Sequence, residues 1–402
     1  MTPSPRPAPV WRNRNFLPLW SGLLVSNLGD WINYVAMYAV VYQQTHSPLA
    51  VVGLRLIHIV PELLFAPFAG VFVDRWSRKK TLTVSPLISA VFVALLVFVH
   101  PVVLIFAAEA ALTIAAMFFE PAVSATMPNI VAQEDLVQAN TLSRVTSTLA
   151  TLVGGMTGGL LVSGVGASVA FGLDAVSFLV IATLLTSVNV REELRPPSVA
   201  SIERDLLEGL HYLRRHPLVA TVVTAGALFV FAPSTMFTVG IVFAQSVLHA
   251  GSTGYGVLLA GLGAGSLVAA AWMIFVRIQP REELAFAVTG TAQGAAIVLM
   301  GLSHSLPLAA GLYGVAGCMT MINSVAAVTL VQRLVPDQLR GRIFGVASSL
   351  NHLAAFASAL LVAAGVGLLG TAGLITASGT IAAVAGLWAL GVAPRVRVLP
   401  PH

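Results

Sequence analysis

The sequence predicts an all-α membrane protein with about twelve transmembrane helices, arranged as two bundles of six with both ends of the chain on the cytoplasmic side. Three observations lead to this prediction. Only 9% of the 402 residues are charged, whereas a soluble domain has roughly 25%. The apolar residues form runs of about 20, the length of a helix that crosses a bilayer. A single long polar segment divides these runs into two sets of six.

Helices are expected for all twelve runs because an open sheet would leave backbone groups without water or a partner in the bilayer. The first set of spans is expected at 16–42, 49–73, 81–99, 102–126, 139–163 and 168–188. The second set is expected at 218–247, 253–276, 284–303, 307–330, 341–364 and 371–392. The expected domains are a tail (1–15), an N-terminal bundle (16–190), a linker (191–217), a C-terminal bundle (218–393) and a tail (394–402).

The first apolar run is too long for the core of a signal peptide, which has roughly 7–15 residues. We therefore expect an uncleaved first helix behind a short disordered cytoplasmic tail that carries Arg6, Arg12 and Arg14. In the linker, residues 201–214 place Ile202, Leu206, Leu210 and Leu213 at helical spacing, with charges on the opposite face. Two interpretations fit this segment equally: an amphipathic helix on the membrane surface, or a solvated linker helix without membrane contact.

The distribution of basic residues predicts the orientation. The turns expected outside (42–49, 99–102, 163–168, 247–253, 303–307 and 364–371) contain no Lys or Arg, and every Lys and Arg except Arg55 lies in or beside an inside segment. This is the positive-inside pattern. It also explains the net charge of +5 without a nucleic-acid partner. The single cysteine, Cys318, excludes an intrachain disulfide and a paired-cysteine metal site.

The stretch GVFVDRWSRKK (70–80) places unusual charge between the second and third expected helices. A glycine, an Asp-Arg pair and a basic cluster at this point resemble the loop signature of the major facilitator superfamily. The matching residues are Gly70, Asp74, Arg75, Arg78, Lys79 and Lys80. The corresponding loop of the second half, 277–283, lacks the glycine and the aspartate. LVQANTLSRVTSTLA (136–150) and LVPDQLRGRIFGVASSL (334–350) give weak support for an internal repeat.

The fifth expected helix resembles the Gly-Pro-x-x-Gly-Gly element of drug-exporting members of this superfamily. Gly154, Gly155, Gly158 and Gly159 fall in it, with Gly155 in the place of the proline, and they are expected to pack helices closely. The phrases EPAVSATMPNIV, QANTLSR, EGLHYLRRHP and VPDQLRGRIFG are similar to the branch that contains macrolide-efflux proteins and the enterobactin exporter. Together these resemblances cover nearly the whole chain.

The resemblance implies a secondary transporter, a proton-coupled antiporter that exports a hydrophobic or amphipathic drug or siderophore-like molecule by alternating access, as in multidrug resistance. Its implied partners are the substrate, protons and membrane lipids, and a monomer is expected, without cofactor, metal or nucleic acid. A lipid or lysolipid flippase or an uncoupled facilitator is the alternative, and a non-transporting sensor is more remote. No hydrolase, zinc-protease or P-loop motif suggests an enzyme.

Apart from Arg144 and Arg342 near the inner ends of their spans, the charged residues within the expected helices all lie in the first half: Asp30, Arg55, Glu62, Glu109, Glu120 and Asp174. Each costs roughly 2.5–3.5 kcal/mol at the bilayer centre, so a function is the default explanation. Arg55, His58 and Glu62 share one helix face. We expect Asp30, Arg55 and Glu109 to lie at similar depth and to form one cluster.

Asp30, followed by Glu109, is the expected proton carrier, with Arg55, Glu62 and His58 around it. A permanent ion pair that only fixes helix packing is the alternative, and His58 suits packing better than a relay. Asp174 is expected to be structural. Asn351 and His352 are expected to be packing groups.

Gating is predicted from the loop charges. Asp74 and Arg75 suit a cytoplasmic latch, with Arg144 as a partner for Asp74 or Glu120, while Arg78, Lys79 and Lys80 alternatively serve orientation alone. In the resembled fold the first, fourth, seventh and tenth helices line the cavity. This implies that the substrate-binding residues, each of which ordinary packing also explains, are Asn27, Trp31, Tyr34, Tyr38, Met236, Phe237, Met319 and Asn323.

Overall fold

The computed structural model describes residues 13–75, 77–98, 101–132, 135–189, 200–275 and 282–396, and these residues form helices and no strands. The tails, most of the first half of the linker and the loop before residue 282 lie outside this described part. The prediction of an all-helical chain is confirmed. Nine runs in the described residues are long and apolar enough to cross a membrane, the last of which contains both arms of α12.

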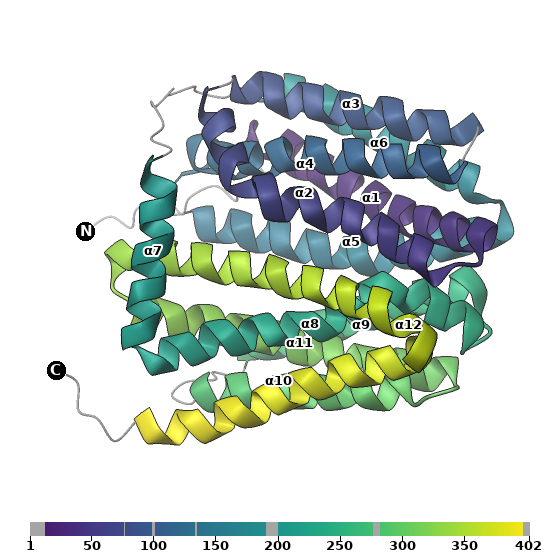
Figure 1. Cartoon of the computed structure of the whole chain (residues 1–402). Helices are drawn as coiled ribbons and strands as arrows, with labels where there is room; N and C mark the ends of the chain where they lie inside the picture. The colour runs from purple at the N-terminus through teal and green to yellow at the C-terminus, as the bar shows by residue number, and fades with distance from the viewer. Residues whose placement is uncertain are drawn as a thin grey trace.

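The first six helices form one group (Figure 1). They are α1 (Phe16–Thr45), α2 (Pro48–Arg75), α3 (Arg78–Phe98), α4 (Val102–Ile130), α5 (Leu136–Gly164) and α6 (Ala167–Thr186). Helix α1 packs mainly on α5 and α6, and α4 packs on α2 and α3. The helix ends agree with the expected spans to within a few residues. Other helices cover both flanks of α1, so α1 is a central helix of this group.

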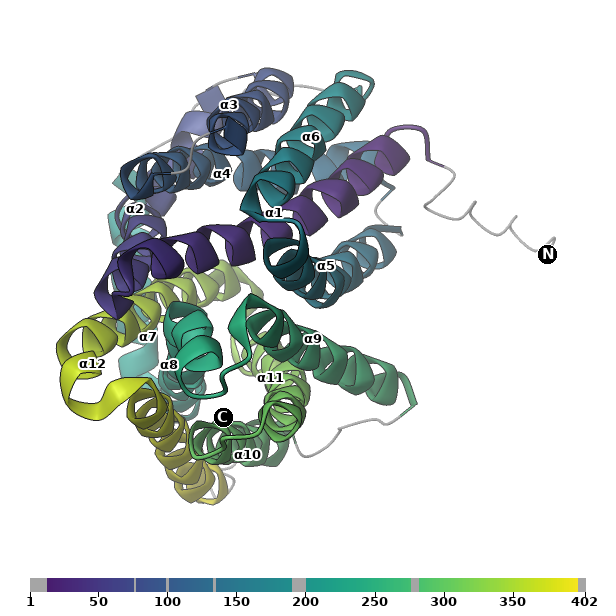
Figure 2. The same ribbon diagram turned by 90° about the vertical axis from the view of Figure 1, so that its right-hand side faces the viewer.

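The remaining long helices form the second group, below the first in Figure 2. They are α8 (Pro217–Ser246), α9 (Gly251–Phe275), α10 (Glu282–Gly301), α11 (Leu306–Leu334) and α12 (Asp337–Val396). Helix α12 consists of two arms, because Gly370 leaves the helical region at φ 63° and ψ 178°. A positive φ of this kind favours glycine. The two arms correspond to the eleventh and twelfth predicted spans, 341–364 and 371–392.

The linker helix α7 (Ala200–Arg215) crosses the ends of the long helices in Figure 1. It packs against the beginning of α12, where Gly209 faces Val346 and the backbone of Arg342. Arg342 forms an ion pair with Glu208, and the Tyr212 hydroxyl donates a hydrogen bond of 3.2 Å to the carbonyl of Leu334. The helix was predicted from its amphipathic pattern. It lies close to α12 because Gly209 has no side chain at this contact.

The two groups meet near one end of the molecule, where α1 and α5 finish and α9 begins. Ser163 Oγ of α5 lies 2.7 Å from Thr253 Oγ1 of α9, and the Tyr34 hydroxyl of α1 donates a hydrogen bond of 2.6 Å to the Phe237 carbonyl of α8. Helices α2 and α12 also touch, through Ile59, Ala355 and Ala359. We call the end with these α5–α9 contacts the closed end, and the opposite end, which carries α7, the linker end.

Candidate functional site

Four polar side chains of α2 and α4 form the centre of the site. The Nδ1 atom of His58 lies 2.8 Å from Oε1 of Glu109 and 3.4 Å from the hydroxyl of Thr113, and its Nε2 atom lies 3.6 Å from Oε1 of Glu62. His58 and Glu62 are one turn apart on α2, and Glu109 and Thr113 are one turn apart on α4. One turn of each helix therefore faces the other. We call these four residues the His58 cluster.

The members of the His58 cluster differ in exposure. The Glu109 side chain is 10% exposed, whereas His58 is 37% and Glu62 is 30% exposed. The imidazole thus has one carboxylate on its buried side and another on its accessible side. Such an arrangement can hold a proton between nitrogen and oxygen and can pass it between the two carboxylates.

Arg55 lies one turn before His58 on α2. Its guanidinium interacts electrostatically with Glu62, Glu109 and the phenols of Tyr34 and Tyr38, and its buried Nε has no hydrogen-bond partner. Within the part of the chain that the structure describes, Arg55 makes no ion pair with Glu109, so the Glu109 carboxylate remains available to His58. Arg55 therefore sets the electrostatic field of the His58 cluster without neutralising one particular acid.

Asp30 lies deeper along its helix than the other two members of the predicted cluster of Asp30, Arg55 and Glu109. Arg55 and Glu109 each lie seven residues from the closed end of their helices, but Asp30 lies fifteen residues from the end of α1. At 1.5 Å per residue Asp30 is roughly 12 Å deeper. In the described part of the chain no ion pair joins it to Arg55. The extension of α1 to Thr45, three residues beyond the predicted end, accounts for about 4.5 Å of this difference.

Asp30 and Glu120 are both exposed although they lie within helices. Helix α1 contacts α2, α4, α5, α6, α8 and α9, so it lies between helices of both groups. Asp30 interacts electrostatically with Glu120 and Glu109. On the other flank of α1, the carboxylate of Asp174 is fully buried and accepts a hydrogen bond of 3.1 Å from the Ser177 hydroxyl.

Glu120 also connects the two groups of helices electrostatically. It interacts with Glu62 and His58 of α2 and with His352 of α12. Glu120 thus faces the space between the groups, on the side toward the linker end. The sequence predicts that His352 is a packing residue. The one signal for a functional role is its position, because it is a titratable side chain in the middle of an otherwise apolar helix.

The aromatic candidates gather toward the closed end. The rings of Trp31 and Tyr34 are 5.4 Å apart, those of Tyr34 and Tyr38 are 4.3 Å apart, and Phe237 lies 5.9 Å from Trp31. Tyr38 and Met236 are fully buried, while Trp31, Tyr34 and Phe237 are half-buried. In this structure the group therefore joins α1 to α8, and only the half-buried members can meet a ligand.

The other substrate candidates lie apart from this aromatic group. Asn27 and Met319 are half-buried. Asn323 is 6% exposed, and its amide nitrogen donates a hydrogen bond of 2.7 Å to the Phe286 carbonyl of α10. Its donor is therefore engaged in holding α11 to α10 in this structure.

For several predicted gating residues only the backbone is described, namely Gly70, Asp74, Arg75 and Arg144. Their backbones belong to α2 and α5. Arg78 is half-buried at the first position of α3. The loop 277–283 falls outside the description except for Glu282 and Glu283, and Glu282 pairs with Arg333 of α11 at 2.8 Å.

The four glycines of α5 are divided between two neighbours. Gly154 and Gly158 face α1, where a Cβ added to Gly158 would lie 3.0 Å from the Cα of Ile32. Gly155 and Gly159 face α9, where a Cβ added to Gly159 would lie 2.6 Å from the Ser252 carbonyl oxygen. The same segment therefore packs within its own group and forms the contact at the closed end.

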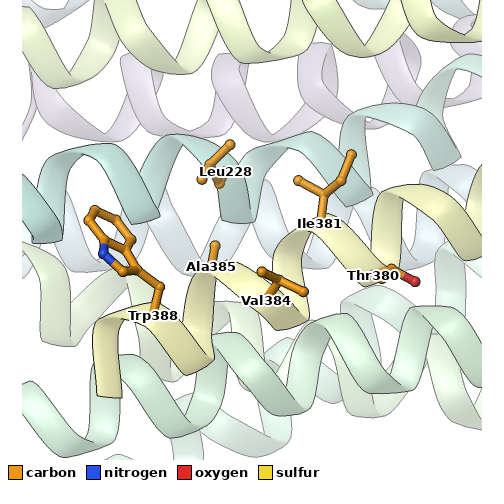
Figure 3. A pocket seen from close by; sticks show the side chains of 6 residues that line it. All are labelled: Leu228, Thr380, Ile381, Val384, Ala385 and Trp388. Atoms are coloured by element: carbon orange, nitrogen blue, oxygen red, sulfur yellow. The ribbon is translucent and has the colours of Figure 1, made fainter. Parts of the chain in front are cut away.

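A shallow groove of about 360 Å³ lies on the surface between α8 and the second arm of α12 (Figure 3). It is lined by Leu228, Thr380, Ile381, Val384, Ala385 and Trp388, with Thr380 as its only hydroxyl. Val384 is 58% exposed and Trp388 is 45% exposed. This groove has none of the ionisable groups that border the space between the two groups of helices.

Comparisons with known proteins agree with the fold. The chain is 24% identical over 358 residues to macrolide efflux protein A of Streptococcus pyogenes, covering 84% of this chain and 86% of that protein. It is 26% identical over 231 residues to the enterobactin exporter EntS of Shigella boydii, covering 57% and 55%. A POT family transporter solved in complex with a thioalcohol conjugated peptide has the same fold, with a TM-score of 0.72 at 13% identity over 94% of this chain and 96% of that one.

The resemblance found in the loop and glycine motifs is confirmed over most of the chain. The sequence profile of the Major Facilitator Superfamily matches residues 19–359, which run from α1 to the first arm of α12. The members of this family are transporters built from membrane helices. The chain belongs to the Major Facilitator Superfamily and is a multi-pass protein of the cell membrane.

Proposed function

We propose that this protein is a proton-coupled exporter of a hydrophobic or amphipathic small molecule, of drug or siderophore-like character. The observation that carries the proposal is the set of ionisable side chains, His58, Glu62, Glu109, Asp30 and Glu120, at mid-helix positions beside the space between the two groups. Charges at such depth are costly and are rarely kept without a function.

The His58 cluster supports proton exchange. Glu109 is shielded while Glu62 is accessible, and His58 contacts both through its two ring nitrogens. Histidine is the side chain whose charge ordinarily changes between about pH 5 and 8. A proton that arrives at Glu62 can therefore reach Glu109 through the imidazole, and Asp30 provides a further acidic position deeper in the protein.

The packing of the two groups supports alternating access. They are joined at the closed end through α5 and α9, whereas Asp30, halfway along α1, and Glu120, beyond the middle of α4 toward the linker end, are exposed. With the orientation predicted from the basic residues, this is a state open to the cytoplasm. In the proposed cycle the contacts at the closed end separate when those at the linker end form.

The side chains beside this space support the substrate class. Trp31, Tyr34 and Phe237 are half-buried aromatics, and Met319 and Asn27 are also half-buried. Aromatic and methionine side chains bind apolar ligands of variable shape. The names of two relatives refer to macrolide efflux and to enterobactin export, which favours export over uptake.

The test is dye or drug efflux from cells that express the full chain, with and without a protonophore. Efflux is expected to collapse with the protonophore and in Asp30→Asn, whereas Glu208→Gln, which changes an acid on α7 away from the space, should keep both the efflux and its sensitivity. Efflux insensitive to the pH gradient would identify an uncoupled facilitator or flippase. If no compound in a panel of drugs, siderophores and lysolipids is transported, that result would contradict the proposal that this protein transports such molecules.

A further inference from the structure

His352 lies on the face of α12 that contacts the first group of helices. Ala355 and Ala359 of α12 pack with Ile59 of α2, and Leu56 and Phe356 flank this contact. Positions 352, 355, 356 and 359 are one turn apart, so they share one helix face. The His352 side chain thus continues this contact by one turn toward the linker end, where α12 begins.

The directions of the helices place His352 opposite the His58 cluster. Helix α2 runs from the closed end to the linker end and α12 starts at the linker end, so the two are antiparallel. One turn beyond Ile59 on α2 is Glu62, at the same level as the turn that holds His352. Glu120 on a third helix, α4, interacts electrostatically with both Glu62 and His352. The three side chains therefore surround one point.

His352 is exceptional within its own group. In the described residues of α8 to α12, the remaining Asp, Glu, Lys, Arg and His side chains lie at helix ends or in turns: His216, His249, Glu282, Glu283, His304, Arg333, Arg340, Arg342 and, with its side chain undescribed, Asp337 and Arg395. Helix α8 has none along its length. The charged groups that face His352 therefore come from α2 and α4, with the Glu208–Arg342 pair further toward the linker end.

We propose that the proton site spans both groups of helices and that His352 is its member on the C-terminal one. This inference rests on the proton coupling proposed above. A protonated His352 attracts the ionised Glu120 and Glu62 across the space and draws the linker ends together. A neutral His352 offers no positive charge opposite Glu62 and Glu120, so the attraction between α12 and the N-terminal group at this level is lost and separation is favoured. Protonation thereby acts directly on the contact between the groups.

The experiment measures the distance between spin labels at the linker ends of the purified full chain, reconstituted in lipid nanodiscs. Labels at Lys80→Cys of α3 and Gln332→Cys of α11 report on the two groups, because both positions are exposed, and Cys318→Ala removes the native thiol. The distance distribution is recorded between pH 8 and pH 5.5. The wild-type background is expected to gain a population with a shorter distance as the pH falls.

Three variants identify the group responsible. In His352→Gln this pH response should disappear, or its midpoint should shift by about one pH unit or more, a tenfold change in proton affinity. In His352→Lys, which keeps a positive charge, the shorter distance should persist at pH 8. Glu120→Gln should weaken the response, and its combination with His352→Gln should add little, because both changes remove one interaction. His304→Gln, in an exposed turn at the other end, is the matched control.

The outcomes separate this inference from the proposed function. A pH response that is unchanged in His352→Gln overturns the role of His352 and leaves proton coupling in place. A wild-type distance that does not depend on pH overturns proton coupling of this movement, and the inference with it. Retention of the response in His352→Lys at its wild-type midpoint also contradicts the inference, even if His352→Gln proves unstable.

Discussion

The two groups of helices use interior polarity in different ways. The N-terminal group places carboxylates, an arginine and a histidine within its helices; Asp30 and Glu120 are exposed, and the His58 side chain is 37% exposed. The C-terminal group instead uses neutral groups whose partners lie within it: Gln293 donates a hydrogen bond of 3.0 Å to the Phe229 carbonyl, and Thr235 and Ser358 hydroxyls lie 2.8 Å apart. His352 departs from this rule.

This difference distinguishes two kinds of polar residue in a membrane helix. A buried amide or hydroxyl with a partner contributes to packing and to the choice of neighbour. An ionisable residue that faces an accessible space has a cost that packing does not offset.

The largest effect is expected from Glu109→Gln, which removes the buried acid of the His58 cluster. The glutamine keeps the size of the side chain, but it cannot exchange a proton with His58, 2.8 Å away. Proton-driven efflux should fall at least about tenfold, the effect of losing a positioned proton-transfer group being typically 10²–10⁴. The check is efflux against a set pH gradient, normalised to the amount of protein in the membrane.

The control for this variant is a second measurement on the same protein. Substrate binding at fixed pH should stay within about threefold of wild type, because Glu109 is 10% exposed and has little surface to offer a ligand. Unchanged efflux in Glu109→Gln would contradict the assignment of the N-terminal group as the one that carries the protons.

The contact between the groups at the closed end should show the next largest effect, in Gly159→Ala. The added Cβ would lie 2.6 Å from the Ser252 carbonyl oxygen and 3.2 Å from the Cα of Gly256, so α5 and α9 must separate. Overpacking of this kind costs about 1–3 kcal/mol. Thermal unfolding in detergent should occur at a lower temperature, and the population closed at this end should decrease.

Gly226→Ala in α8 is the matched control, since a Cβ there meets nothing within 4 Å. Replacing a helical glycine without strain stabilises a protein by about 0.4–1 kcal/mol. The two variants are therefore expected to shift the unfolding temperature in opposite directions. Equal shifts would mean that the close packing of α5 against α9 makes no specific contribution to stability.

A neutral polar residue of the C-terminal group should affect stability alone. Asn323→Ala removes an amide that donates a hydrogen bond of 2.7 Å to the Phe286 carbonyl, with an expected loss of about 1–2 kcal/mol. Protonophore-sensitive efflux per folded molecule should stay the same. A changed pH profile in this variant would instead place Asn323 in the coupling machinery and blur the distinction between the groups.

The sequence predicted the helices well because each depends on a local property, a run of apolar residues long enough for the bilayer. The break between the last two spans was also local, since Gly370 takes a φ of 63° that few other residues adopt. The motif around Gly70 and the glycines of α5 identified the family for the same reason. These features can be found without knowing which helices are neighbours.

The site was harder to predict because it depends on the offset between helices. The spacing of His58 and Glu62 on one face was evident, but the pairing of His58 with Glu109 needs the register of α2 against α4. The depth of Asp30 relative to Arg55 and Glu109 likewise depends on how α1 is offset against α2 and α4. His352 was missed because its neighbours, Glu62 and Glu120, lie more than two hundred residues earlier in the chain.

The smallest effect is expected where α7 docks onto the C-terminal group. Glu208 and Arg342 form an ion pair, but their side chains are 38% and 31% exposed, so solvent screens the attraction. A double-mutant cycle with Glu208→Gln and Arg342→Gln should give a coupling of about 0.2–1 kcal/mol, smaller in high salt. The measurement is thermal unfolding at low and high ionic strength. A coupling well above this range would show that α7 is an integral part of the second group, whereas zero coupling would leave Gly209 and Tyr212 as the contacts that hold it.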